Sequence, residues 1–184
     1  MKPCELLEFL HVIERMKSNT RHSWTAEGRH ESVAEHSYRL LVMAFLLRDE
    51  LPDIDMERVL KLCLVHDWGE ALTGDIPSFF KTGDDERRED EAVTALLRTL
   101  PEREGELSAL FAELNAKETR ESRLCRALDM LEAVIQHNEA PLGTWIEREY
   151  ELNRVYGERE CSEFPFVAEL RALARIDTEE KTRA

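Results

Sequence analysis

The sequence has few residues that break helices, and it lacks a long apolar segment. Its 184 residues include 7 glycines and 6 prolines. Because these two residues are the least compatible with a helix interior, their low number favours helices over strands. No apolar run approaches the ~18 residues that a membrane-spanning helix needs, and residues 1–5 carry no apolar segment typical of a signal peptide. We therefore expect a helical, cytoplasmic protein that makes no contact with a membrane.

Paired cysteines and an excess of positive charge are also missing. The four cysteines, at positions 4, 63, 125 and 161, form no C-x-x-C pair, so we expect reduced thiols. The formal net charge is −14, which repels polyphosphate and argues against a nucleic-acid-binding surface. A small anionic substrate is compatible with this charge only if a metal ion and a few local cations reverse the field inside one pocket.

Apolar residues are present at helical spacing almost throughout the chain. They make up 42% of it, which is enough for a core, and the length is that of one domain. We interpret residues 18–31 as an irregular loop and the tail from residue 177 as frayed. A capping box at residues 32–35 predicts the start of a helix. The expected helices span residues 6–16, 36–47, 56–67, 84–100, 102–117, 121–138, 141–152 and 164–176.

Four side chains on these helices have the chemistry of a metal site. His66 and Asp67 end one helix, where a carboxylate is unfavourable unless a cation compensates it. His36 lies on another helix, and Asp129 lies inside an apolar one, where an unpaired carboxylate is costly to bury. Each has an ordinary alternative: His36 as a hydrogen-bonded core residue, Asp129 as a charge beside the apolar stripe. Together they offer mixed imidazole and carboxylate ligands, which suit a divalent ion.

The order of several short motifs resembles the HD-domain superfamily of metal-dependent phosphohydrolases, whose pattern is H…HD…D on a helical bundle. Upstream residues are similar to the YfbR-type 5′-deoxynucleotidases and their eukaryotic relatives. The resemblance covers about residues 4–140 and implies an all-α HD-domain bundle. Residues 1–184 would be one domain, with a catalytic core at about 4–140 and C-terminal helices at 141–176. The motifs are Arg21-x-x-Trp24, E-S-V-A-E-H at 31–36, His66-Asp67-x-x-Glu70, Gly74-Asp75-Ile76-Pro77 and Leu128-Asp129-x-x-Glu132.

The resemblance implies one divalent metal ion (Mn, Co, Fe, Ni, Zn or Mg) with four protein ligands. Such an ion would polarise a phosphoryl oxygen and lower the pKa of a bound water. The ligands would be His36, His66, Asp67 and Asp129.

The same resemblance implies catalytic roles for two further carboxylates. Glu70, three residues after Asp67 and on the same helical face, would be the acid–base residue. Asp75 would lie near the sugar and phosphate. Each has an ordinary alternative: Glu70 as a solvated charge in a first helical turn, and Asp75 as a turn-forming residue.

The resemblance also implies residues that would bind the substrate. The guanidinium of Arg21 matches two phosphate oxygens, and Trp24 would shape the sugar pocket so that it excludes a 2′-hydroxyl. In this sequence two residues separate Arg21 from Trp24, whereas in some family members the pair is adjacent. Ile76, Pro77 and Ser78 would line the pocket.

Several other residues are left with open interpretations. Glu132, one turn after Asp129, either orients a metal ligand or is a solvated charge. The remaining histidines have no spacing that indicates a ligand. The apolar residues Leu107, Leu110, Phe111 and Trp145 belong either to the core or to the interface of a homodimer, which many relatives form.

The expected activity is hydrolysis of deoxyribonucleoside 5′-monophosphates to deoxynucleoside and phosphate. One alternative keeps the fold and the metal but changes the substrate to a nucleotide triphosphate, a cyclic dinucleotide or an alarmone. The other is a non-catalytic scaffold, which the full set of candidate ligands argues against.

Overall fold

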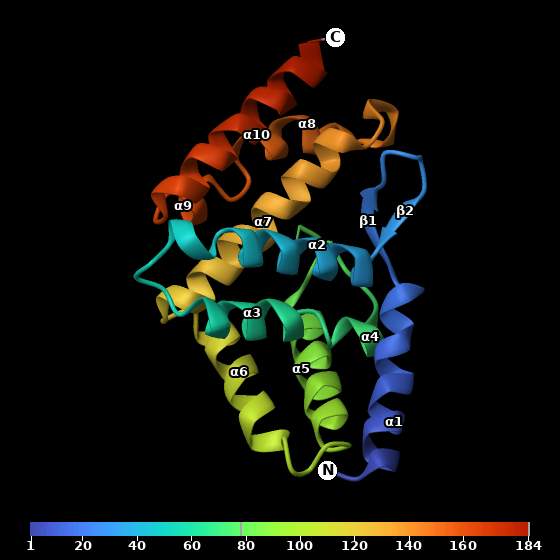
Figure 1. Cartoon of the computed structure of the whole chain (residues 1–184). Helices are drawn as coiled ribbons and strands as arrows, with labels where there is room; N and C mark the ends of the chain where they lie inside the picture. Colours follow the sequence, from blue (N-terminus) through green and yellow to red (C-terminus); the bar gives the residue numbers. More distant parts are fainter. Residues whose placement is uncertain (78, 184) are drawn as a thin grey trace.

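The computed structural model describes residues 1–77 and 79–183, which form a bundle of helices with one short hairpin (Figure 1). The all-α class expected from the sequence is confirmed. Within the described residues, no helix combines the length and the apolarity that crossing a bilayer requires. The elements are α1 (Pro3–Ile13), the 3₁₀ helix η1 (Glu14–Lys17), β1 (Thr20–Trp24), β2 (His30–Ser32), α2 (Val33–Leu46), η2 (Arg48–Glu50), α3 (Met56–Val65), α4 (Glu70–Thr73), α5 (Gly83–Leu97), α6 (Glu104–Ala116), α7 (Arg120–Glu139), η3 (Leu142–Thr144), α8 (Glu147–Val155), α9 (Glu158–Cys161) and α10 (Pro165–Arg183).

Side-chain caps fix where α2 and α3 begin. Ser32 accepts a hydrogen bond from the backbone of Glu35, whose carboxylate accepts one from the backbone of Ser32, so the predicted capping box is present. At α3, Asp55 accepts a hydrogen bond of 3.0 Å from the backbone N–H of Arg58. These two starting points place His36 in the first turn of α2 and His66 directly after α3.

The long helix α7 is the element against which α2, α3 and α10 pack. Its residues Leu124, Leu128 and Leu131 are fully buried in the core. Figure 1 shows α2 and α3 lying next to each other and crossing α7. The crossing brings the first turn of α2, the end of α3 and the centre of α7 together.

Residues 18–31 contain an antiparallel hairpin, so the prediction of an irregular loop was wrong. Strand β1 pairs with β2, with Thr20 opposite Ser32 and Trp24 opposite His30, and the ladder is irregular between Thr20 and Trp24. Both strands are short and mostly polar. They therefore lack the alternation of apolar and polar residues by which a strand is recognised in a sequence.

The C-terminal region also differs from the prediction. Pro141 precedes only the 3₁₀ helix η3, which ends at Trp145, where the backbone is extended and the indole N–H donates to the carbonyl of His137 in α7. The α-helix begins only at Glu147. Helix α10 continues to Arg183, so the tail is helical. The hydroxyl of the fully buried Thr178 donates to Asn138 of α7 (2.8 Å), which holds this part of α10 in place.

Four apolar residues were assigned by the sequence either to the core or to a dimer interface, and most of them belong to the core. Leu107, Leu110 and Trp145 are buried within the chain itself. Phe111 is partly buried and packs against the same core.

We predict that Gly157→Ala destabilises the protein. Gly157, before α9, has φ +75°, and an added Cβ would lie 2.9 Å from the Cβ of Met130 on α7. A non-glycine residue in this conformation costs about 1–3 kcal/mol, and the close contact with the buried helix adds to it. Gly105→Ala, in the open first turn of α6, is the control and should stabilise by up to about 1 kcal/mol. Equal free energies of unfolding in urea for the two variants would contradict the prediction.

Candidate metal centre and active-site cavity

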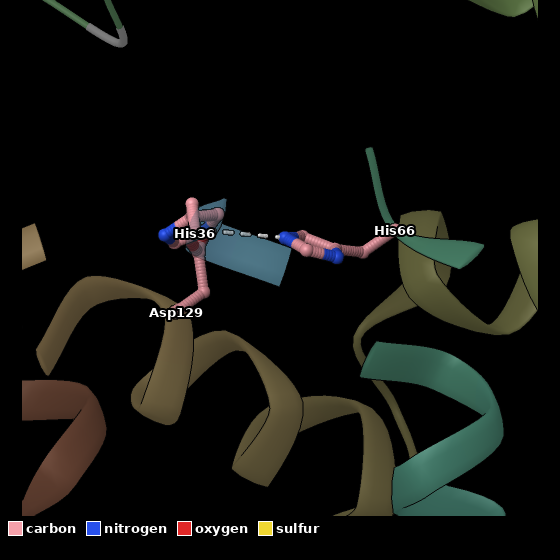
Figure 2. Close-up of side chains that lie close together, drawn as sticks. All are labelled: His36, His66 and Asp129. Atoms are coloured by element: carbon pink, nitrogen blue, oxygen red, sulfur yellow. Dashed lines mark hydrogen bonds and ion pairs between the residues drawn. The ribbon is translucent and has the colours of Figure 1, made fainter. Parts of the chain in front are cut away.

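Two imidazoles and two carboxylates converge where α2, α3 and α7 cross. The Nε2 atom of His36 lies 3.3 Å from Nε2 of His66 and 3.2 Å from Oδ1 of Asp129. Oδ2 of Asp67 lies 3.0 Å from Nε2 of His66 and 3.7 Å from Nε2 of His36. Figure 2 shows the two rings and Asp129 directed towards one another. The donor atoms of His36, His66 and Asp129 all lie within 4.8 Å of one another, so this group could hold a metal ion.

The hydrogen bonds of the Nδ1 atoms of His36 and His66 indicate that this site would bind a cation. Nδ1 of His66 lies 2.8 Å from the carbonyl of Cys63, and Nδ1 of His36 contacts the carboxylate of Glu132. Since a carbonyl and a carboxylate only accept, each Nδ1 carries a proton, and in a neutral ring Nε2 then presents a lone pair. Two lone pairs facing each other beside two carboxylates repel unless a cation lies among them. The side chains therefore fit a divalent metal ion.

The charges of the cluster favour positive charge in the same place. Burial lowers the pKa of His66, but the carboxylates of Asp67 and Asp129 outweigh burial and raise that pKa to about 10. For Asp67, burial alone would raise the pKa. The positive charges of His66, His36 and Arg21 outweigh burial and lower that pKa to about 2. Burial would likewise raise the pKa of Asp129, but His36 and His66 outweigh it, so this pKa is also lowered. The two carboxylates are therefore ionised at neutral pH and attract a cation.

Glu132 contacts the ring nitrogen of His36 that faces away from the cluster. It is fully buried, and its carboxylate contacts Nδ1 of His36 and accepts a hydrogen bond of 2.6 Å from Nε of Arg39. Although burial raises the pKa of Glu132, its cationic neighbours lower it. Of the two interpretations of Glu132, the solvated charge was wrong. Glu132, Glu31 and His36 also form a second group whose donor atoms lie within 4.8 Å of one another.

The four-residue cluster opens onto a cavity of about 630 Å³. His66, Asp67 and Asp129 line it, together with the two predicted catalytic carboxylates, Glu70 and Asp75. Glu70 is buried, and its Oε2 has no hydrogen-bond partner among the described residues. Burial, reinforced by Asp67 and Asp75, raises the pKa of Glu70 well above its ordinary value. Burial is also the main cause of a raised pKa at Asp75.

Two arginines approach the cluster, one on each carboxylate. Nη1 of Arg21 lies 3.5 Å from Oδ2 of Asp67, and Nη1 of Arg126 lies 3.2 Å from Oδ2 of Asp129. Both line the cavity. The sequence predicted Arg21 but missed Arg126. Its position three residues before Asp129 on the same helix was the signal that could have identified it.

Of the other residues predicted to bind the substrate, some line the cavity and Trp24 does not. Ile76 and Pro77 line the cavity next to Asp75, and Ser78 lies outside the described residues. Trp24 is not among the described lining residues. It lies opposite His30 in the hairpin, and the two ring centroids are 4.1 Å apart. Cross-strand pairing therefore holds this indole on the hairpin and not in the cavity.

We predict that Glu70→Gln stabilises the metal-free protein at pH 8. Because the pKa of Glu70 is higher in the folded chain than its value of about 4.3 in the unfolded chain, the folded state loses stability as pH rises through this interval. A neutral amide avoids that loss, and each unit of pKa shift corresponds to about 1.4 kcal/mol. Urea unfolding in the presence of a chelator should show the variant more stable at pH 8, with the difference largely gone at pH 4. A variant less stable than the wild type at pH 8 would contradict this.

Comparisons with known proteins identify the family of the chain. The family model described as HD domain matches residues 13–165. Human and bovine 5′-deoxynucleotidase HDDC2 are each 34% identical to the chain over 139 residues, which is 73% of this chain and 67% of theirs. The 5′-deoxynucleotidase hdd1 of Schizosaccharomyces pombe is 29% identical over 178 residues, 92% of this chain and 83% of its own.

A solved structure shows the same arrangement of helices. It is described as a predicted metal-dependent phosphohydrolase from Magnetospirillum magnetotacticum MS-1, and it matches with a TM-score of 0.75 and 30% identity, covering 98% of this chain and 95% of that one. The resemblance seen in the motifs is thereby confirmed, and the chain belongs to the HD domain family.

Proposed function

We propose that the protein is a metal-dependent phosphomonoesterase that hydrolyses 2′-deoxyribonucleoside 5′-monophosphates to deoxynucleoside and phosphate. The observation that carries the proposal is the convergence of two imidazole nitrogens and two carboxylates at the wall of a cavity that also holds Glu70. The names of the similar human, bovine and yeast proteins support the substrate class.

The metal ligands in this proposal are His36, His66, Asp67 and Asp129. Nitrogen and oxygen donors of this kind suit Mn, Co, Fe, Ni, Zn or Mg, and the residues do not select one of them. A divalent ion bound there supplies a Lewis acid for a phosphoryl oxygen and a lowered pKa for a water molecule. Glu132 keeps the proton of His36 on Nδ1, so that Nε2 is available as a ligand.

Glu70 is the acid–base residue of the proposal. Its pKa, raised by burial and by the neighbouring Asp67 and Asp75, makes the carboxylate a stronger base than that of an ordinary glutamate. It would take the proton of the attacking water or donate one to the leaving 5′-oxygen. Asp75 lies on the same cavity wall, beside Ile76 and Pro77, and would contact the sugar side of the substrate.

Arg21 and Arg126 would bind the phosphate. Each guanidinium is placed by a contact with one of the two metal-binding carboxylates, so the two cations would approach the phosphate from different sides. Guanidinium groups donate two hydrogen bonds to neighbouring phosphate oxygens. Together with the metal ion, they give a chain of net charge −14 a local field that attracts an anion.

The volume and the lining of the cavity also indicate which phosphate ester would be bound. Its volume of about 630 Å³ lies within the usual range for small-ligand sites, roughly 300–1,000 Å³, and it accommodates a mononucleotide. Because Trp24 packs on the hairpin, exclusion of a 2′-hydroxyl would fall to the residues beside Asp75 that do line the cavity, Ile76 and Pro77. A nucleotide triphosphate, a cyclic dinucleotide or an alarmone remains the alternative substrate.

We predict metal-dependent phosphate release from dNMPs, with much slower release from the matching rNMPs. Glu70→Gln should lower kcat by about 10²–10⁴-fold, because it removes the proton-transferring group, and it should leave the bound metal in place. Phosphate release should be measured with each of several divalent ions, in parallel with metal analysis of the variant.

Glu91→Gln on α5 is the matched control, because Glu91 is exposed and is not one of the described lining residues. It should retain full activity. Equal rates with dNMP and rNMP would contradict deoxy selectivity. Activity that survives Glu70→Gln would contradict the role of Glu70, and absence of phosphate release with every ion would favour the non-catalytic scaffold.

A further inference from the structure

A buried carboxylate outside the metal cluster organises the opposite end of the cavity. Glu149 of α8 is only 1% exposed. One oxygen accepts a hydrogen bond of 2.8 Å from the backbone of Ile146, and the other lies 2.9 Å from Nε2 of His22 and 3.4 Å from Nε2 of His137. Nδ1 of His137 is in turn 3.0 Å from Oδ1 of Asn153. Residues from β1, α7 and α8 are thus held together in one polar group.

Three members of this group line the same cavity as the metal cluster, namely His22, His137 and Asn153. The distance to the metal cluster follows from α7. Asp129, Ala133 and His137 succeed one another at intervals of four residues, and all three line the cavity, so they form one row on the helix. At a rise of 1.5 Å per residue, the row is about 12 Å long.

That length suits a nucleotide. If a phosphate lies at Asp129, a deoxyribose passes over the small side chain of Ala133, and the base reaches His137. Figure 1 shows β1 and α8 on either side of the C-terminal half of α7, where this end of the row lies, and β1 contacts α7.

The composition of this end suits a heteroaromatic ring. Phe79 lines it with the two histidines, and the His22 ring contacts the Phe79 ring edge to face, with the centroids 5.9 Å apart. An apolar and aromatic surface with a few fixed polar groups is the usual composition of a small-molecule site. The other end of the cavity also has apolar side chains in its lining, those of Phe111 and Leu114, but three carboxylates, Glu86, Glu89 and Asp90, line it with them.

We propose that the His22–Phe79–His137–Asn153 end of the cavity binds the nucleobase of the substrate. The inference rests on the proposed function, because that function places the phosphate at the metal cluster. The aromatic rings, that of His137 included, contact the face of the base. The amide nitrogen of Asn153, which has no hydrogen-bond partner among the described residues, contacts its polar edge, and Glu149 is a positioning residue that fixes the two imidazoles. Helix α8, which lies beyond the catalytic core expected from the sequence, therefore contributes to substrate binding.

The test compares a dNMP with 2-deoxyribose 5-phosphate, which has the same phosphate and sugar but no base. Phe79→Ala and His137→Leu should lower kcat/KM for the dNMP by about 5- to 100-fold, the range expected for the loss of a base-stacking or edge contact. The loss should appear in KM, with kcat nearly unchanged, and kcat/KM for the base-free sugar phosphate should not change. Phe45→Ala, at a residue that is 57% exposed and not in the described cavity lining, is the control.

Binding of the free deoxynucleoside, measured by titration calorimetry, separates this inference from the proposed function. Binding that Phe79→Ala and His137→Leu weaken supports the base site even if the protein releases no phosphate. The inference is overturned if the protein binds no deoxynucleoside, or if it hydrolyses dNMP and the base-free sugar phosphate equally well. It is also overturned if both variants reduce turnover of the two substrates equally while circular dichroism shows them folded.

Discussion

The structure depends on one electrostatic constraint: two imidazole nitrogens and two carboxylates lie within a few ångströms of one another and need a positive charge among them. His36 and His66 face each other through Nε2, because Nδ1 of each ring is already bonded to an acceptor. Protons or a metal ion can supply the missing charge, and the pKa of about 10 at His66 shows how strongly the surroundings favour it. A cluster of this kind is costly for folding alone, which is why we interpret it as a binding site.

The fold meets this constraint by fixing helix ends and one helix centre. The capping box at Ser32 and the cap at Asp55 set the starts of α2 and α3, and these two helices carry His36 and His66 to α7. The buried leucines of α7 hold Asp129 at the crossing, and Glu132, one turn later, contacts His36. A single helix therefore supplies a candidate ligand and the carboxylate that orients a second one.

The sequence predicted those parts of the site that depend on local patterns. His36 and Asp129 lie on helices with clear apolar periodicity, and His66 and Asp67 directly follow one. The order of the four along the chain matches a known family motif. Arg126 was missed although Asp129 lies only three residues away, and the β1–β2 hairpin was missed because its strands are short and mostly polar. Glu149 was missed because its role comes from contacts between residues far apart in the sequence. Glu149 is separated from His22 by more than a hundred positions, and no spacing rule connects them. The sequence also predicted Trp24 in the sugar pocket, whereas its ring packs on His30 in the hairpin and Trp24 is not among the described lining residues.

The most direct test of the central claim is a calorimetric titration of the chelator-treated protein with a divalent ion such as Mn²⁺ or Co²⁺. Our account predicts one ion per chain, release of protons on binding, loss of binding in His66→Ala and Asp129→Asn, and retention of binding in Glu31→Gln. The last variant distinguishes this cluster from the neighbouring Glu31–His36–Glu132 group. Binding that survives both His66→Ala and Asp129→Asn, or absence of binding by the unaltered protein, would contradict the account.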